Sequence, residues 1–104
     1  MKYIPKRKYR LSGGFLSRTF SITARNGQVI LKGDTFFTKR GRRRGMLAVA
    51  INSQLDSRFK RLVSETLYHF QLVDDKNRAI GNSQLYTSKQ AMEKGIASVK
   101  YNAI

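Results

Sequence analysis

Apolar and polar residues alternate along residues 16–24, and this pattern predicts a half-buried β-strand. Arg18 is the one interruption on the inward side. The alternation returns fifty residues later, with Tyr68, Phe70 and Leu72 inward. In the first strand the expected inward residues are Leu16, Phe20, Ile22 and Ala24, and the outward ones are Ser17, Thr19, Ser21 and Thr23.

A turn signal follows each of these strands. Asn26-Gly27 supplies the positive-φ residues of a tight hairpin, so we expect a returning strand over QVILK, residues 28–32. In the second half the polar segment DDKNR, residues 74–78, leads to the corresponding return. This second turn should be looser, because Lys76-Asn77 replaces Asn-Gly.

Each half then changes from an extended to a helical period. Leading strands are expected over residues 8–11 and 58–63, and a further extended piece ends at residues 36–37 and 85–86. After it, Ser88 can cap a helix N-terminus. An apolar stripe at i, i+4, i+7 and i+11 gives this helix one buried face: Met92, Ile96, Val99 and Ala103.

The two halves align without a gap when the sequence is shifted by fifty residues. Six of ten matched pairs are identical, and the other four conserve character, which indicates an internal duplication. The pairs are Phe20/Phe70, Ile22/Leu72, Ile30/Ile80, Phe36/Tyr86, Thr38/Ser88, Lys39/Lys89, Gly45/Gly95, Met46/Ile96, Val49/Val99 and Asn52/Asn102.

These patterns predict an α+β fold of tandem ββββα or βββα repeats, with antiparallel sheets and one helix per repeat. A half of this size is near the lower limit for independent folding. We therefore expect one pseudo-symmetric domain over residues 1–104, made of a basic repeat with its N-terminal basic segment (1–54) and a second repeat (55–104).

The net charge of the chain bears on its partner rather than on its fold. The chain has 21 basic and 6 acidic residues, a net charge of +15, and such an excess points to a polyanion, most commonly nucleic acid. Residues 1–52 contain 13 of the basic residues and a single acid, Asp34. The first half should therefore build most of any polyanion-binding surface.

Several chemistries find no support in the sequence. Without cysteine there is no disulfide or thiolate metal site, and no stretch is apolar enough to cross a bilayer. The N-terminus lacks the apolar segment of a secretory signal, so we expect a cytoplasmic protein. His69 is the only histidine and is expected to be an exposed strand residue, and Asp74-Asp75 suits a turn. We expect no enzyme activity, cofactor or metal.

The segments Tyr86-Thr87-Ser88-Lys89 and 95–103 (GIASVKYNA) resemble the YegP family of small tandem-repeat proteins. The first half matches the same pattern through Asn26-Gly27, Thr38-Lys39 and Gly45, among others. The resemblance implies a β-rich sheet with one helix per repeat, a bacterial or phage origin and no established enzymatic activity. The basic N-terminal segment and GRRRGMLAVA depart from the family pattern, and we look there for this protein's own task.

The basic run at 39–44 aligns with the opening turn of the second helix. Cations near a helix N-terminus oppose the macrodipole and repel one another, which suggests that an external anion compensates them. A plainly solvated face is the alternative. Arg42 matches the core position Met92, and partial burial across the sheet edge is an alternative for it. Gly45 aligns with Gly95 inside the helix, where close packing on the sheet explains a glycine.

The N-terminal segment MKYIPKRKYR mixes cations with Tyr3 and Tyr9, a combination suited to phosphate contact and base stacking. The alternative is a tail whose tyrosines pack on the domain. A smaller cluster at 58–61 aligns with the start of the first repeat. The candidate nucleic-acid-binding residues are Lys2, Tyr3, Lys6, Arg7, Lys8, Tyr9, Arg10, Lys39, Arg40, Arg42, Arg43, Arg44, Arg58, Lys60 and Arg61.

The leading hypothesis is a non-enzymatic protein that binds RNA or DNA through phosphate and shape, with RNA or single-stranded DNA favoured. The second is a small bacterial or phage adaptor that binds an acidic protein through the same basic face. Exposed edge strands can pair between chains, so both a monomer and a homodimer are open. No membrane partner is expected.

Overall fold

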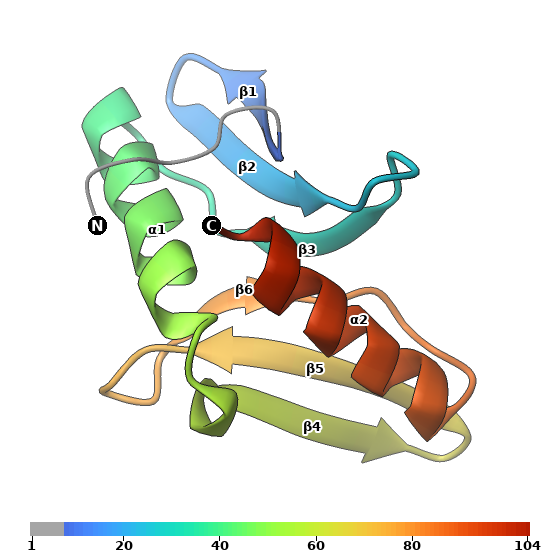
Figure 1. Cartoon of the computed structure of the whole chain (residues 1–104). Coiled ribbons are helices and arrows are strands. Elements are labelled where there is room, and N and C mark those ends of the chain that lie inside the picture. Colours follow the sequence, from blue (N-terminus) through green and yellow to red (C-terminus); the bar gives the residue numbers. More distant parts are fainter. Residues whose placement is uncertain (1–7) are drawn as a thin grey trace.

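The computed structural model describes residues 8–104 as one six-stranded antiparallel sheet with two helices (Figure 1). The sheet order is β1-β2-β3-β6-β5-β4. The elements are β1 (Tyr9–Gly14), β2 (Ser17–Thr23), β3 (Val29–Gly33), α1 (Lys39–Asn52), the 3₁₀ helix η1 (Asp56–Arg58), β4 (Phe59–Ser64), β5 (Leu67–Val73), β6 (Ala79–Asn82) and α2 (Lys89–Asn102). The α+β prediction is confirmed, in its βββα form.

The two halves share one continuous sheet. The pieces ending near residues 36 and 86 are not strands but single β-bridges, from Phe36 to Arg18 and from Tyr86 to Tyr68. The two halves meet at the sheet centre, where Lys32 of β3 pairs with Asn82 of β6.

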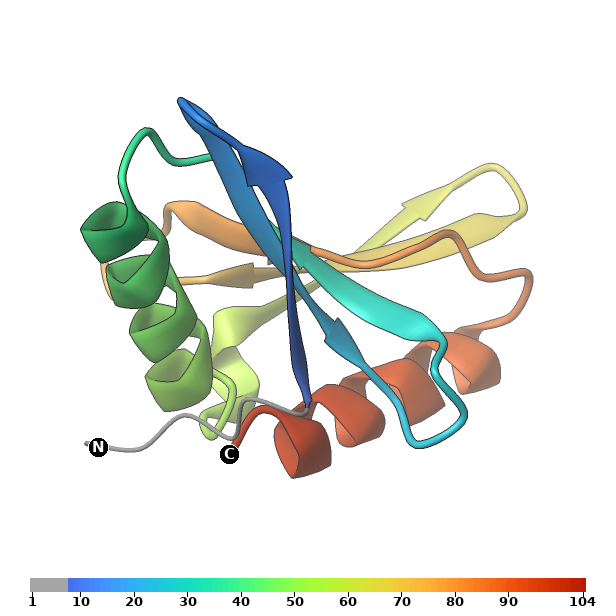
Figure 2. The same ribbon diagram turned by 90° about the horizontal axis from the view of Figure 1, so that it is seen from above.

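Both helices lie on one face of the sheet, and within residues 8–104 no helix covers the other face (Figures 1 and 2). Helix α1 packs on β2, β5 and β6, while α2 packs on β2, β3 and β5, so each helix contacts strands of both halves. A shared core results, because neither half can bury its apolar face alone. The core includes Phe20, Ile22, Leu31, Phe70, Leu72 and the predicted stripe Met92, Ile96, Val99 and Ala103.

The elements of the second half follow those of the first at an offset of fifty residues: β1 and β4, β2 and β5, and α1 and α2 all have matching bounds. The packing matches too. The rings of Phe20 and Phe36 stack at 6.2 Å with a 13° interplanar angle, and those of Phe70 and Tyr86 repeat both values. Below, residues fifty positions apart are called counterparts. Their origin by duplication stays a prediction.

The prediction that Lys76-Asn77 makes the second turn looser is wrong. Asn77 takes a positive φ of 64°, as Gly27 does at 85° in the first turn, and both N–H groups close a turn three residues back, at 3.0 and 2.9 Å. The Asp74 carboxylate tightens the second turn by accepting from the backbone N–H groups of Arg78 and Lys76, each at 2.9 Å. These bonds, that from Arg78 foremost, hold the pKa of Asp74 below its usual value.

Four other local predictions need correction. Thr23, expected to face outward, is buried. Leu16 does not point inward: it lies in the two-residue turn between β1 and β2, with a φ of 66°. In the turn between β2 and β3, Gly27 has a positive φ and Asn26 does not; Asn26 accepts the Gln28 N–H through its side chain at 3.0 Å. His69 is half-buried rather than exposed.

The two helix starts are built alike. Thr38 caps α1 through a bond from the Gly41 N–H to its Oγ1 at 2.9 Å, and Ser88 caps α2 through a bond from the Ala91 N–H at 3.0 Å. Within residues 8–104, neither helix has the length and apolar character that crossing a bilayer would require.

Candidate nucleic-acid interface

The basic run forms the first turns of α1, as expected. Four of its side chains are exposed, and the first turn contains no acid. Because the helix N-terminus already has partial positive charge, these cations are placed where the helix itself disfavours them. We call this group the α1 basic surface: Lys39, Arg40, Arg43 and Arg44.

Arg42, the fifth cation of the run, is used inside the chain. Its side chain is half-buried, and Nη1 donates to the carbonyl oxygens of Ser12 at 3.3 Å and Thr19 at 3.5 Å. It therefore links α1 to the hairpin of β1 and β2. This is the partly buried position that its match to Met92 suggested.

Two exposed phenylalanines, joined by Arg18, form a second surface feature next to the α1 basic surface. Phe37 precedes the helix cap and is 74% exposed, and Phe15 is 82% exposed at the tip of the hairpin. Arg18 connects them: its Nη1 donates to the Phe37 carbonyl at 2.6 Å, and its guanidinium carbon lies 5.9 Å from the centre of the Phe15 ring. The signal for Phe37 was the Phe36-Phe37 doublet, since only one member of an extended pair can face inward.

Two cations of the second half, Arg61 and Lys100, are neutralised by nearby carboxylates. Arg61 donates through Nε to Glu93 at 2.6 Å and through Nη2 to Asp56 at 3.1 Å, and Lys100 donates to Asp56 at 2.7 Å. The bonds from Lys100 and then Arg61 lower the pKa of Asp56, and that from Arg61 lowers the pKa of Glu93. Arg61, a candidate residue, thus already has two carboxylate partners.

Every ion pair among residues 8–104 lies in this second half, the remaining one joining Arg78 to Asp74 at 3.0 Å. The four cations of the α1 basic surface form none within the described chain. Arg43 illustrates the contrast, because its counterpart is Glu93. The acids are placed where they leave the basic surface of the first half uncompensated.

The remaining cations of the cluster at 58–61 separate. Arg58 donates Nη1 to the Oδ1 of Asn52 and is half-buried, whereas Lys60 is exposed. Lys60 stands in a polar row that crosses all six strands on the face opposite the helices. In strand order the row is Arg10, Ser21, Lys32, Asn82, Gln71 and Lys60. Lys32, at its middle, was missed from the sequence because its neighbours there come from other strands.

The N-terminal candidate binding residues lie in different environments. Tyr9 is 4% exposed, and its hydroxyl donates to the Ala103 carbonyl at 2.8 Å; burial raises its pKa. Of the two interpretations of this tyrosine, packing therefore holds and base stacking does not. Lys8 is half-buried and Arg10 is exposed. The predictions for Lys2, Tyr3, Lys6 and Arg7 fall outside the described residues.

No group of three or more His, Cys, Asp or Glu side chains in residues 8–104 is arranged to hold a metal ion. The arrangement is thus one of a sheet, two helices and charged surfaces: a small α+β protein whose candidate site is a surface.

Comparison with known proteins places this architecture. The chain belongs to the UPF0339 family, to which YegP belongs. It is 38% identical over 84 residues to a UPF0339 protein of Acinetobacter baylyi and 36% identical over 84 residues to YegP of Escherichia coli K12; each alignment covers 80% of this chain and 76% of the relative. The profile of a domain of unknown function, DUF1508, matches residues 64–104. The resemblance to the YegP family is confirmed.

Solved structures agree with the fold. The solution NMR structure of a UPF0339 protein from Shewanella oneidensis superposes with a TM-score of 0.83 at 33% identity, covering 91% of this chain and 82% of that one. The NMR structure of Escherichia coli YegP, described as a protein of unknown function, gives a TM-score of 0.83 at 31% identity over 91% of this chain and 84% of that one.

Proposed function

We propose that this protein is a non-enzymatic, cytoplasmic nucleic-acid-binding protein that contacts phosphates through the α1 basic surface, with RNA or single-stranded DNA as the preferred form. One observation carries the proposal. Four exposed cations cluster on the first turns of α1 without an ion-pair partner among residues 8–104, while the ion pairs all lie elsewhere. Phosphates would supply the missing negative charge and release counterions on binding.

The exposed rings of Phe15 and Phe37 support a single-stranded ligand. A base has a flat face that stacks on an aromatic side chain, and in a duplex that face is occupied by neighbouring base pairs. The Arg18 guanidinium next to Phe15 adds a cation beside this stacking surface. Phosphate contacts are sequence-independent, so limited sequence preference is expected.

The test is a titration of labelled single-stranded RNA, single-stranded DNA and duplex DNA at several salt concentrations, read by fluorescence anisotropy. The variant Arg40→Gln/Arg43→Gln/Arg44→Gln removes three exposed cations while keeping helix-forming side chains. If each contacts a phosphate, the slope of log K against log salt should fall by about 2, from roughly 0.7 per contact on a single strand. Arg42 is left unchanged because its side chain bonds inside the chain.

A control variant removes the same charge elsewhere: Lys76→Gln/Arg78→Gln/Lys89→Gln. It should keep most of the wild-type slope, because contacts rather than net charge determine counterion release. Equal slopes for the two variants would contradict the α1 basic surface as the contact site. If the wild type binds none of the three nucleic-acid forms at low salt, nucleic-acid binding itself is contradicted.

An acidic protein is the second candidate partner, and the exposed phenylalanines beside the cations favour it, since aromatic residues and arginine are enriched in protein interfaces. Pull-down after exhaustive nuclease treatment separates the two. A partner protein that is retained by the wild type and lost with the Arg40/Arg43/Arg44 variant would support an adaptor.

A further inference from the structure

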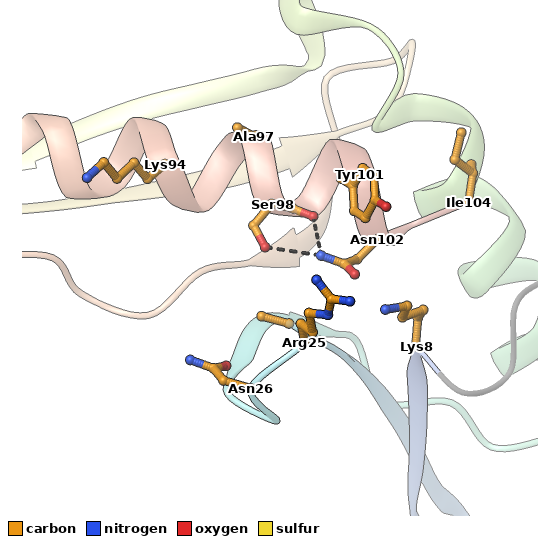
Figure 3. A pocket seen from close by; sticks show the side chains of 10 residues that line it. Lys8, Arg25, Asn26, Lys94, Ala97, Ser98, Tyr101, Asn102 and Ile104 are labelled. Carbon is orange, nitrogen blue, oxygen red and sulfur yellow. Dashed lines mark hydrogen bonds between the residues drawn. The ribbon is translucent and has the colours of Figure 1, made fainter.

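A groove lies between the end of α2, the start of β1 and the turn that joins β2 to β3 (Figure 3). Its volume is about 910 Å³. Lys8, Arg25, Lys94, Tyr101 and Asn102 are among its lining residues. None of these belongs to the α1 basic surface, so this is a separate feature of the molecule.

Asn102 is the unusual member of this groove. It is 4% exposed, and its Nδ2 donates to the carbonyl oxygen of Ser98 at 2.8 Å and to the Ser98 hydroxyl at 3.1 Å. Its Oδ1 is buried and has no hydrogen-bond partner in the described chain. A buried acceptor without a donor is destabilising and rare, so a donor from outside these contacts is expected.

The counterpart of Asn102 shows what normally fills this position. Asn52 also donates its Nδ2 one helical turn back, to the Ala48 carbonyl at 2.8 Å, but its Oδ1 accepts from Arg58 Nη1. The counterpart of Arg58 is Lys8. Lys8 lines the groove, and its hydrogen bonds within residues 8–104 are those that its backbone carbonyl accepts from Thr23. The Oδ1 of Asn52 therefore accepts from an arginine, whereas the Oδ1 of Asn102 has no donor in the described chain.

The surroundings of this open acceptor specify its ligand. The Lys8 and Arg25 side chains extend towards the Asn102 amide, so an anionic group held by these cations would lie next to Oδ1 (Figure 3). Phosphate oxygens cannot donate to Oδ1, and the ligand therefore needs a hydroxyl or amino donor close to its phosphate. In RNA the ribose 2′-hydroxyl is such a donor, and DNA lacks it.

We propose that this groove binds one ribonucleotide unit of an RNA chain and makes the protein prefer RNA to DNA. Lys8 and Arg25 contact a phosphate, the 2′-hydroxyl donates to Asn102 Oδ1, and a base stacks on Tyr101, which is 80% exposed. Because Oδ1 is buried, side chains that line the groove shift to admit the sugar, and the flexible Lys8 side chain can do so while it contacts the phosphate. This proposal rests on nucleic-acid binding, and it adds a basis for choosing between the two nucleic acids.

The experiment compares three single strands of identical sequence, oligo(A) as RNA, as DNA and as 2′-O-methyl RNA, with the full-length protein. The methyl group removes the donor and keeps the remaining ribose and phosphate groups. Wild type should bind RNA about tenfold more tightly than either of the others, the effect expected of one well-placed hydrogen bond. Equal affinity for the three strands would overturn the proposal.

The decisive variant is Lys8→Arg, which keeps the charge and recreates the arginine that closes Asn52. It should raise the thermal stability, because it supplies the missing donor, and abolish the preference for RNA. The matched control, Lys76→Arg, makes the same change at an exposed turn and should leave the preference unchanged. A preference for RNA that survives Lys8→Arg would overturn the proposal.

A second measurement follows the side-chain amide of Asn102 by NMR during addition of adenosine 5′-monophosphate or its 2′-deoxy form. The ribonucleotide should shift this signal and the deoxynucleotide should not; identical shifts would count against the site. If RNA and DNA bind equally and the α1 variant weakens both, the groove proposal fails while nucleic-acid binding stands. If no strand binds the wild type, both fail.

Discussion

Replacing Gly95 by alanine tests the packing of α2 against the segment that precedes it. A Cβ at this position would lie 2.2 Å from the Tyr86 hydroxyl oxygen and 2.7 Å from Cζ of the same ring. Carbon atoms in favourable contact are about 3.5–4.0 Å apart, so the ring would have to withdraw by roughly an ångström. It cannot do so freely, because it stacks on Phe70, which is fully buried.

Two opposing effects determine the size of the change. In a helix interior alanine is favoured over glycine by about 0.8–1.0 kcal/mol, whereas overpacking a core typically costs about 1–3 kcal/mol. Since Gly95 is itself buried, overpacking should prevail and lower the free energy of unfolding by about 1 kcal/mol or somewhat more. For a domain of this size each kcal/mol lowers Tm by about 4–8 °C.

Thermal and urea unfolding, followed by circular dichroism, measure the effect. The control places Gly95→Ala in a Tyr86→Leu background, where the ring is absent and the alanine should be neutral or stabilising. A Tm that rises with Gly95→Ala in the wild-type background would refute the close-packing explanation, because that is the behaviour of an exposed helical glycine.

Arg42→Met gives α1 the side chain that α2 has at Met92, and it should leave the salt slope of nucleic-acid binding unchanged because the guanidinium bonds inside the chain. Arg43→Met should lower that slope by about 0.7, and equal slopes for the two would contradict this division. Asp56→Asn with Glu93→Gln should reduce the acid sensitivity of the fold. Basic partners lower the pKa values of both carboxyl groups in the folded state. The ion pairs therefore stabilise the fold fully above the pKa values of the unfolded chain, about 4, and this stabilisation is lost as the pH falls through the lower pKa values of the folded state. The Tm difference between about pH 7 and about pH 2 should shrink in the double variant, and an unchanged difference would argue against these ion pairs.

Much of the fold was predictable because its signals are local. The apolar stripe of α2 and its cap at Ser88 depend on residues within one or two helical turns, and the structure contains both. The alternation in β2 predicted the inward Phe20 and Ile22 but not where the strand begins, so Leu16 was assigned to the core instead of the turn. The Asn77 turn was misjudged because its geometry depends on the side chain of another residue, Asp74.

The location of the candidate site was predictable from the sequence, but many of its side-chain contacts were not. The helical setting of the basic run followed from alignment with α2, which also suggested partial burial for Arg42. Which acids neutralise which cations could not follow from sequence, because Arg61 meets Glu93 from 32 positions away. The unpaired acceptor of Asn102 likewise exists only once α2 is packed against the start of β1.

The differences between counterparts bear on what the charge is for. Where the second half pairs Arg61 with Glu93, the first half has Leu11, 50% exposed, and Arg43, exposed and without an ion-pair partner in the described chain. The first arrangement stabilises the fold; the second opposes the helix dipole and leaves an apolar side chain in water. Folding stability alone does not account for such a substitution, because the scaffold already accommodates the stabilising version. This difference supports the proposal that a negatively charged partner binds these cations once the chain has folded.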